Sequence, residues 1–294
     1  MPAIEKLNDC LKEKCGFKDG LFYYLPKVSD FLKKEIDFHD RVSGAEEEIH
    51  QLKALRNKFY HQWFKKYIYQ LPPDSLIMEI GAGSGFDLIP ILERGYRLIA
   101  CDISEASVRF IKNKLAGLKI SGQISYLVAD GQNLPLPDNS VDCLFLAASL
   151  HHFENQADLL SEILRILKKN GRLIFAMEPS KFMMGFTRLF KNSKKLRLHQ
   201  GHSEADESHA GYGQKDFTAL IRENNLSKIK IKRVWLLQGF IHYGLEAIFR
   251  LFKLKKRLKL PRIIEWPLLI LDEILLKIPL LNALNFHWVV ILNT

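Results

Sequence analysis

Short apolar runs alternate with segments of helical hydrophobic spacing through the middle of the chain, between residues 75 and 178. Each run has the length of a strand and few polar side chains, which is typical of strands buried on both faces of a parallel sheet. The segments between them carry helix signals, such as Ser104 at an N-cap position and Asn170-Gly171 after a last helical turn. We therefore expect an α/β fold. Its strands are expected over residues 75–80, 97–101, 124–129, 141–147 and 172–177.

Two more strands are expected toward the C-terminus. Residues 228–232 alternate strictly between polar and apolar side chains, and residues 286–292 form a buried apolar run. Residues 240–284, which separate these strands, contain two segments of helical spacing rich in Leu and Ile. We expect this stretch to be a helical insertion before the last strand.

Residues 1–70 are expected to form a helical cap that contains 12 of the 32 aromatic residues in its 17–69 stretch. Two interpretations stay open. The aromatic residues either pack a helix against the edge of the sheet or line an apolar substrate pocket. Leu71-Pro72-Pro73-Asp74 ends the cap, because proline blocks helix continuation. Residues 71–294 then form the α/β domain, within which residues 180–215 are expected to be a lid.

The stretch Leu76–Asp87 (L-I-M-E-I-G-A-G-S-G-F-D) predicts a strand that turns abruptly into a helix. Gly81, Gly83 and Gly85 allow positive φ angles and a close approach of the backbone to a ligand. Glu79 lies inside the buried strand, where a carboxylate is costly unless it is paired. A cationic or hydrogen-bond-donating ligand is therefore expected at this turn.

Two more acids, Asp102 and Asp130, follow the next two expected strands. With the motif E-I-G-A-G-S-G they resemble the class I S-adenosylmethionine-dependent methyltransferases, and in particular the small-molecule group typified by the ubiquinone and menaquinone methyltransferases. The phrases L-P-L-P-D-N-S-V-D (134–142), S-L-H-H-F (149–153) and the run from residue 160 to 173 fit the same group. The resemblance covers roughly residues 71–180.

This resemblance implies a Rossmann-like, seven-stranded methyltransferase sheet of order 3-2-1-4-5-7-6 with strand 7 antiparallel. It implies S-adenosyl-L-methionine as cofactor and S-adenosyl-L-homocysteine as product. Glu79 would bind the amino group, Asp102 the ribose hydroxyls and Asp130 the adenine amino group. The cofactor-binding residues implied as a set are Glu79, Gly81, Ala82, Gly83, Gly85, Asp102, Ile103, Asp130, Gly131 and Ala147.

His151 and His152 follow the fourth expected strand, where the acceptor should meet the methyl group, and they are the candidate catalytic bases. Alternatively, one or both hydrogen-bond to the backbone and shape the loop. Members of the class that methylate amino groups carry Asn/Asp-Pro-Pro-Tyr/Phe here, whereas this chain has Ala148-Ser149-Leu150-His151. O- or C-methylation therefore remains open. A dinucleotide oxidoreductase is disfavoured, because Phe86 stands where its fingerprint needs glycine or alanine.

The net charge of +10 is concentrated in two segments. Residues 181–200 hold six Lys or Arg and no acid, and residues 228–262 hold eleven with the single acid Glu246, so the rest of the chain carries −6. Such segments suit an anionic membrane surface or nucleic acid, and Leu and Ile between the charges favour the membrane. The insertion 240–284 is interpreted either as packed helices with a solvated basic face or as a helix in the membrane interface.

The four cysteines form no C-x-x-C pair, and Cys101 and Cys143 fall in buried strands, so reduced thiols are expected. No signal peptide or membrane-spanning run is visible, which favours a cytoplasmic protein, peripheral to the inner face of the membrane if the basic insertion binds lipid. No metal site is expected. The weak alternatives are Cys10 and Cys15 with His39, or a histidine group at 199, 202 and 209.

The sequence thus predicts a methyltransferase that acts on a hydroxyl or carbon of an apolar or lipid-linked small molecule, at the membrane surface if the basic insertion binds lipid. An RNA methyltransferase and an inactive, cofactor-binding partner subunit are the alternatives. The acceptor and the oligomeric state are not encoded in any motif that we can interpret.

Overall fold

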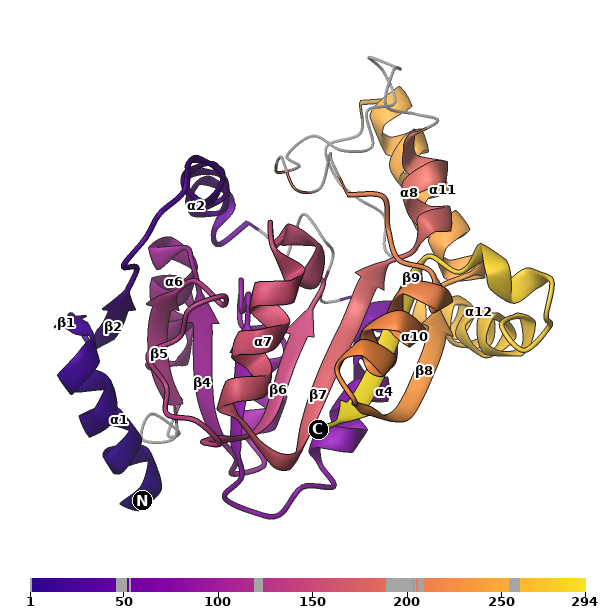
Figure 1. Cartoon of the computed structure of the whole chain (residues 1–294). Coiled ribbons are helices and arrows are strands. Elements are labelled where there is room, and N and C mark those ends of the chain that lie inside the picture. Colours follow the sequence, from indigo (N-terminus) through magenta and orange to yellow (C-terminus); the bar gives the residue numbers. More distant parts are fainter. Residues whose placement is uncertain are drawn as a thin grey trace.

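The computed structural model describes residues 2–45, 52, 54–118, 124–188, 203, 205, 209–253 and 260–294. Its centre is one mixed sheet of nine strands in the order β1-β2-β5-β4-β3-β6-β7-β9-β8 (Figure 1). The strands are β1 (Gly16–Lys18), β2 (Leu21–Tyr24), β3 (Leu76–Ile80), β4 (Arg97–Asp102), β5 (Ile124–Ala129), β6 (Val141–Ala147), β7 (Leu167–Pro179), β8 (Ser227–Val234) and β9 (His287–Asn293). The expected α/β, Rossmann-like architecture is confirmed.

The expected number of seven strands is wrong, because the N-terminal segment is not wholly helical. β1 and β2 form a hairpin, and β2 pairs in parallel with β5 at the edge of the sheet. The two-residue turn between them is Asp19-Gly20, and both residues have positive φ angles of 51° and 75°. Turns of this kind suit the right-handed twist of a hairpin. The other seven strands lie in the order β5-β4-β3-β6-β7-β9-β8, and β9 runs antiparallel to both of its neighbours.

Helices cover both faces of the sheet. They are α1 (Pro2–Lys14), α2 (Asp30–Val42), α4 (Leu55–Ile68), α5 (Leu88–Leu92), α6 (Glu105–Leu115), α7 (Gln156–Ile166), α8 (Lys181–Arg188), α10 (Gln214–Glu223), α11 (Leu237–Leu251) and α12 (Arg262–Leu275), with the 3-10 turns η2 (Leu150–His152) and η3 (Leu281–Leu284). Alternate residues of β3 face opposite layers, so Met78 packs with α1, α7 and α10, whereas Ile77 packs with α4, α5 and α6. Both layers are apolar, as a central parallel strand requires.

The helix expected over residues 157–168 ends two residues early, whereas Pro90 is accommodated by a late helix start, one of the two outcomes expected for it. α7 ends at Ile166 instead of Lys168, because the chain enters β7 at once and passes through Asn170 with a φ of 62°. α5 begins only at Leu88, which places Pro90 in its first turn, where a missing N–H costs nothing. This late start accommodates the proline without a kink.

The aromatic residues of the N-terminal segment serve both expected purposes. On α4, Tyr60 and Phe64 are fully buried against the sheet, so this helix is part of the core. On α2, Phe31 and Phe38 line the large cavity instead. α2 lies beyond the carboxyl ends of β4 and β5, as Figure 1 shows. Within the cap, α4 therefore packs against the sheet, whereas α2 forms part of the cavity wall.

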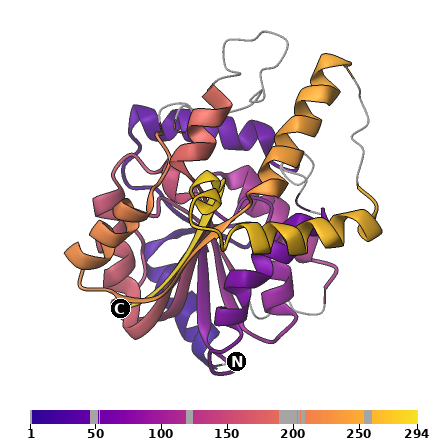
Figure 2. The ribbon, with the colours of Figure 1, turned by 90° about the vertical axis from the view of Figure 1, so that its right-hand side faces the viewer.

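The insertion consists of α11 and α12, which lie at the surface and diverge from the point where the start of α11 meets the end of α12 (Figure 2). A buried acid, Asp272 on α12, accepts hydrogen bonds from the backbone N–H groups of Leu236 and Gln238 at the start of α11, and also from the Tyr60 hydroxyl on α4. These bonds attach the insertion to the core. Within the residues that the structure describes, no helix is long and apolar enough to cross a membrane.

Candidate active site

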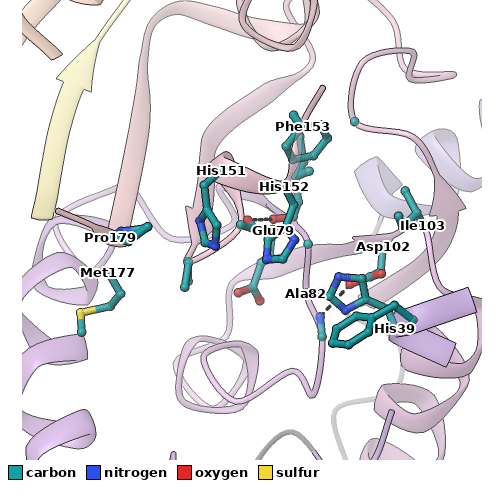
Figure 3. Close-up of a pocket in the computed structure, with 18 of the residues that line it drawn as sticks. His39, Glu79, Ala82, Asp102, Ile103, His151, His152, Phe153, Met177 and Pro179 are labelled. Atoms are coloured by element: carbon teal, nitrogen blue, oxygen red, sulfur yellow. Dashed lines mark hydrogen bonds between the residues drawn. The ribbon is translucent and has the colours of Figure 1, made fainter. Parts of the chain in front are cut away.

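A cavity of about 1180 Å³ opens at the carboxyl ends of the parallel strands. In open α/β sheets, ligands bind at this edge at the point where the strand order reverses. Here that point is β3, because β4 and β5 lie on one side of it and β6 and β7 on the other. All of the predicted cofactor residues except Gly85 line the cavity, and so do His151 and His152. Figure 3 shows Glu79, Ala82, Asp102 and Ile103 with the two histidines. The volume exceeds the roughly 300–1,000 Å³ that is usual for one small ligand. The cavity therefore has room for a cofactor and an acceptor together.

The glycine turn after β3 is folded back on the end of β4. The backbone N–H groups of Gly81 and Ala82 both donate to the carbonyl oxygen of Cys101, at 2.9 and 3.1 Å. Gly81 has a φ of 71°, and a Cβ there would lie 2.5 Å from the Cβ of Ser149. Gly85 also has a positive φ, 66°, but a Cβ on it would meet Ile111 on α6. Gly85 thus holds the loop to its helix, whereas Gly81 shapes the cavity.

We expect Gly81→Ala to destabilise the protein and to weaken cofactor binding. The left-handed conformation alone costs a residue with a side chain about 1–2 kcal/mol, and the contact with Ser149 adds to it. Denaturant unfolding and calorimetry with S-adenosylmethionine would measure the two effects. Gly117→Ala is the matched control, since a Cβ on Gly117 meets nothing within 4 Å. Equal stability of the two variants would contradict this account of the turn.

Asp102 ends β4 with both carboxylate oxygens held by the backbone. Its Oδ2 accepts from the N–H of Gly83 at 2.8 Å, and its Oδ1 accepts from the N–H of Ser104 at 2.9 Å. Each oxygen has a second lone pair, so the carboxylate can accept further bonds from a ligand while its orientation stays fixed. Ile103 follows it and also lines the cavity. This arrangement fits a ribose and an adenine ring.

Glu79 is 3% exposed, and its Oε2 has no hydrogen-bond partner among the described atoms. Burial, followed by the nearby charge of Asp87, raises the pKa of the Glu79 carboxyl well above its usual value. A buried carboxylate oxygen without a partner is destabilising, and a ligand ammonium group would remove that cost. The amino group of S-adenosylmethionine fits this requirement.

Asp130 and Gly131 follow β5 and line the cavity with Ala147. The Oδ1 of Asp130 accepts from the backbone N–H of Gln132 at 3.0 Å, which fixes the turn. Gly131 is closely packed, since a Cβ there would lie 2.8 Å from Ile80 and 3.0 Å from Phe153. The structure therefore brings together at one edge the three acids that the sequence placed at the ends of successive strands.

A buried cluster behind the glycine turn was not foreseen from the sequence. The Oδ2 of Asp87 lies 2.7 Å from Nδ1 of His61, and its Oδ1 accepts from Nζ of Lys65 at 2.8 Å. Burial acts to raise the pKa of Asp87, but these two partners on α4 outweigh it and lower that pKa below its usual range. The signal available was the four-residue spacing of His61 and Lys65, which places them on one helical face. α4 is thereby fixed to the cofactor loop.

His151 is paired with a carboxylate that sequence reasoning missed. Its Nδ1 lies 2.9 Å from Oε2 of Glu178, which is 0% exposed. The other oxygen of Glu178 accepts from the backbone N–H groups of Ser149 and Leu150, at 3.0 and 2.9 Å. The preceding residue, Met177, has a φ of 57°, a strained conformation of the kind found at functional sites. Glu178 therefore fixes the orientation of the His151 ring.

His152 has a different partner. Its Nδ1 lies 3.1 Å from Oε2 of Glu35 on α2. Burial acts to raise the pKa of Glu35, but the hydrogen bond with His152 and the nearby imidazole of His39 lower it to about 2. The two adjacent histidines thus contact separate acids, and Glu35 too was absent from the sequence-based prediction.

The remaining walls of the cavity are largely apolar. They come from α2, α8, α11 and the turn between β8 and α11, and their apolar residues include Phe31, Phe38, Met183, Met184, Trp235 and Tyr243. α8 and α11 also contribute the polar residues Arg188, His242 and Glu246. Much of the predicted lid, residues 189–202, lies outside the described residues. Its first part, α8, contributes Met183 and Met184. The acceptor end of the cavity is suited to an apolar molecule.

The two weak metal hypotheses from the sequence gain no support within the described part of the chain. His39 is grouped there with Glu35 and His152 and not with Cys10 or Cys15, which are both free cysteines. His199 and His202 lie outside the described residues. His209 accepts a hydrogen bond from the N–H of Gly211 at its Nδ1.

Comparison with known proteins agrees with this geometry. Residues 78–175 match a family described as "Methyltransferase domain". The ubiquinone/menaquinone biosynthesis C-methyltransferase UbiE of Marinomonas sp. is 26% identical over 162 residues, which is 50% of this chain and 64% of that protein. The UbiE of Pseudomonas fluorescens is 28% identical over 121 residues, or 39% and 47% of the two chains. The chain thus matches about half to two thirds of the length of these relatives.

Among solved structures, phosphoethanolamine N-methyltransferase 2 of Haemonchus contortus in complex with S-adenosyl-L-methionine has a similar fold. The TM-score is 0.58 at 16% identity, and the alignment covers 91% of this chain and 60% of the other. The fold, the three acids and these matches make the chain similar to the class I S-adenosylmethionine-dependent methyltransferases. Within that class it is similar to the group that contains the UbiE C-methyltransferases.

Proposed function

We propose that the protein transfers a methyl group from S-adenosylmethionine to a hydroxyl or a carbon of an apolar small molecule, with His151 as the base. The observation that carries the proposal is the buried Glu178–His151 pair in a cavity that also contains the unpartnered oxygen of Glu79. Glu79, Asp102 and Asp130 bind the cofactor at one end. The apolar walls from α2, α8 and α11 bind the acceptor at the other.

Bound S-adenosylmethionine supplies an electrophilic methyl group on its sulfonium. The chain's own residues hold the acceptor in line with it, and such positioning is worth roughly 7–11 kcal/mol. The acceptor oxygen or carbon bonds to the methyl carbon, the carbon–sulfur bond breaks, and its electron pair stays on sulfur. Because Nδ1 of His151 is bonded to Glu178, the other ring nitrogen, Nε2, takes the proton that the acceptor loses.

Partition of labelled methyl tests this function. The protein is incubated with methyl-labelled S-adenosylmethionine and a cell lysate, which is then separated into organic extract, RNA and protein. We expect the label in the organic extract. Label in RNA would instead indicate an RNA methyltransferase, and cofactor binding without any transfer would indicate an inactive partner subunit.

We also propose that α11 and α12 rest on an anionic membrane surface. Their exposed side chains are unusually apolar, with Ile263 83% and Ile270 55% exposed, and Leu280 just after α12 is 86% exposed. The linker between the helices contributes basic residues in the sequence 253–262. Each Lys or Arg near anionic lipid is worth about 1 kcal/mol, and the apolar side chains would enter the interface. A cytoplasmic protein peripheral to the inner membrane face would have this arrangement.

We expect the protein to float with vesicles of phosphatidylglycerol and phosphatidylcholine at low salt, and to float less with phosphatidylcholine alone. Ile263→Asp combined with Leu280→Asp should reduce the bound fraction at least about tenfold, because each removes apolar surface from the interface. Leu118→Asp is the control, since Leu118 is exposed at the end of α6, away from the insertion. Equal flotation of both variants would rule out this surface.

A further inference from the structure

Three potential metal ligands meet at the mouth of the cavity, where α2 faces η2. They are Glu35 and His39 on α2 and His152 on η2, and their ligand atoms all lie within 4.8 Å of one another. Both histidines line the cavity. Figure 3 shows that the side chains of His39 and His152 line the same pocket as that of Asp102. We propose that these residues form a binding site for a divalent transition-metal ion that holds an oxygen of the acceptor.

Glu35 makes a hydrogen bond with His152, whose Nδ1 also lies 3.2 Å from the Ser203 hydroxyl, whereas its longer distance to His39 suits a shared ion better than a hydrogen bond. Oε2 of Glu35 lies 3.1 Å from Nδ1 of His152 and 3.7 Å from Nε2 of His39. The second distance is too long for a good hydrogen bond. Ligands about 2.0–2.1 Å from a tetrahedral ion are separated from each other by roughly 3.3 Å, which lies between these two values. Small side-chain movements would bring the three ligands to one ion.

The surrounding bonds orient the ligands. Glu35 and His39 are four residues apart on α2, so both side chains lie on one face of the helix. The second oxygen of Glu35 accepts from the backbone N–H of Ala205 at 3.3 Å, which turns Oε2 toward the histidines. Outer contacts of this kind fix the geometry of metal ligands. Glu35 itself is 1% exposed, and a buried carboxylate is costly unless it is paired with hydrogen-bond donors or a cation.

α2 is also tied to the cofactor end of the cavity. The Oδ1 of Asp40, next to His39, accepts from the Ser104 hydroxyl at 2.6 Å and from the backbone N–H of Ala106 at 3.3 Å. Ser104 in turn donates its own N–H to Asp102. The candidate metal site and the candidate ribose ligand therefore share one support, and their separation is set by α2 and α6.

Two histidines and one carboxylate leave coordination positions open for a substrate, as in catalytic sites of zinc and non-haem iron. An acceptor hydroxyl bound there would be stabilised as the oxyanion after its proton passes to His151. The two adjacent histidines would then have different roles, because His151 would act as the base and His152 would bind the metal ion. This role rests on the proposed methyl transfer, but the binding of a metal does not.

The site is tested with the metal alone, in the absence of cofactor and acceptor. The full chain is freed of metal with EDTA, and Zn²⁺ is titrated by calorimetry, with Co²⁺ as a spectroscopic probe of nitrogen and oxygen ligands. We expect one ion per chain. Glu35→Gln, His39→Gln and His152→Gln should each weaken Zn²⁺ binding by more than about 100-fold, since even outer contacts are worth 10–100-fold.

Asp37→Asn is the matched control, because Asp37 is an exposed acid on the same helix, and it should leave the affinity unchanged. Thermal unfolding in EDTA checks that each variant is folded. Because there are three separate variants, the test still stands if one of them does not fold. The proposal is overturned if the native chain binds no Zn²⁺, or if a folded variant binds it as tightly as the native chain. A metal-binding protein that transfers no methyl group would refute the proposed function and leave this site in place.

Discussion

Replacing Asp102 by alanine should weaken S-adenosylmethionine binding by on the order of 100-fold or more, measured by calorimetry. The expected loss has two parts. The variant removes an ionised acceptor that can bind ribose hydroxyls, and hydrogen bonds to charged groups contribute about 1.5–3 kcal/mol. It also removes the acceptor for the N–H groups of Gly83 and Ser104, so the glycine turn loses its support. Both losses weaken the binding of S-adenosylmethionine.

Asp102→Asn separates these parts. Its amide oxygen can still accept one backbone bond, so the turn keeps some support while the charge is lost. Asp138→Ala is the control, because Asp138 is an exposed acid paired with Arg165, away from the cavity. We expect the order of affinity to be native, then Asn, then Ala. Unchanged affinity in a folded Asp102→Ala variant would mean that S-adenosylmethionine does not bind here.

The cofactor half of the site could be predicted because its signals are local in the sequence. Glu79 lies one residue before the end of β3, Asp102 ends β4 and Asp130 follows β5, and the apolar run of each strand is short and clear. Parallel strands place these ends at one edge of the sheet, so three separate sequence positions become one site without any knowledge of side-chain contacts. Gly85 shows the limit of such reasoning. Its motif position suggested a ligand contact, whereas its place in the structure is against Ile111.

The extra strands were missed although a strong local signal was present. Asp19-Gly20 lies between the apolar positions of Phe17 and Leu21, which is a typical sequence for a two-residue hairpin turn. The many aromatic residues and the charged helices around it favoured a helical interpretation of the whole segment. The strands are short, three and four residues, and they are stabilised by pairing with β5 rather than by their own pattern.

The partners of the two histidines could not be predicted for a different reason. Glu178 is 27 residues from His151, and Glu35 is 117 residues from His152. One sequence gives no information on which acids will face which bases across such separations. Glu178 could only be placed at the end of a strand, and Glu35 on a helix among several other acids. The three-dimensional arrangement is what distinguishes an oriented base from a loop histidine.

Replacing His151 by alanine should reduce methyl transfer by about 10²- to 10⁴-fold, the usual contribution of a positioned base. Cofactor affinity should stay close to that of the native protein, because no predicted cofactor contact is removed. The rate is measured as the initial incorporation of labelled methyl into the organic extract. His151→Ala with native turnover and native folding would exclude this histidine as the base.

Glu178→Gln tests whether the carboxylate acts through His151. The glutamine side chain can still accept bonds from Ser149 and Leu150, so the loop should keep its shape. Without the anionic partner, the protonated imidazole is less stable. The acid limb of the pH–rate profile should therefore move to lower pH, and the maximal rate should fall. A purely structural role would lower the amount of folded protein and leave the profile where it was.

Glu162→Gln is the matched control for this change. Glu162 lies on α7, where its carboxylate pairs with Arg165 outside the cavity, so its loss should leave the profile in place. Combining Glu178→Gln with His151→Ala distinguishes an effect of Glu178 through His151 from an independent effect on catalysis. If the two residues form one unit, the double variant should be no slower than His151→Ala alone, because the acid then has no base left to orient. Additive losses would show that Glu178 contributes to catalysis independently of the histidine that it contacts.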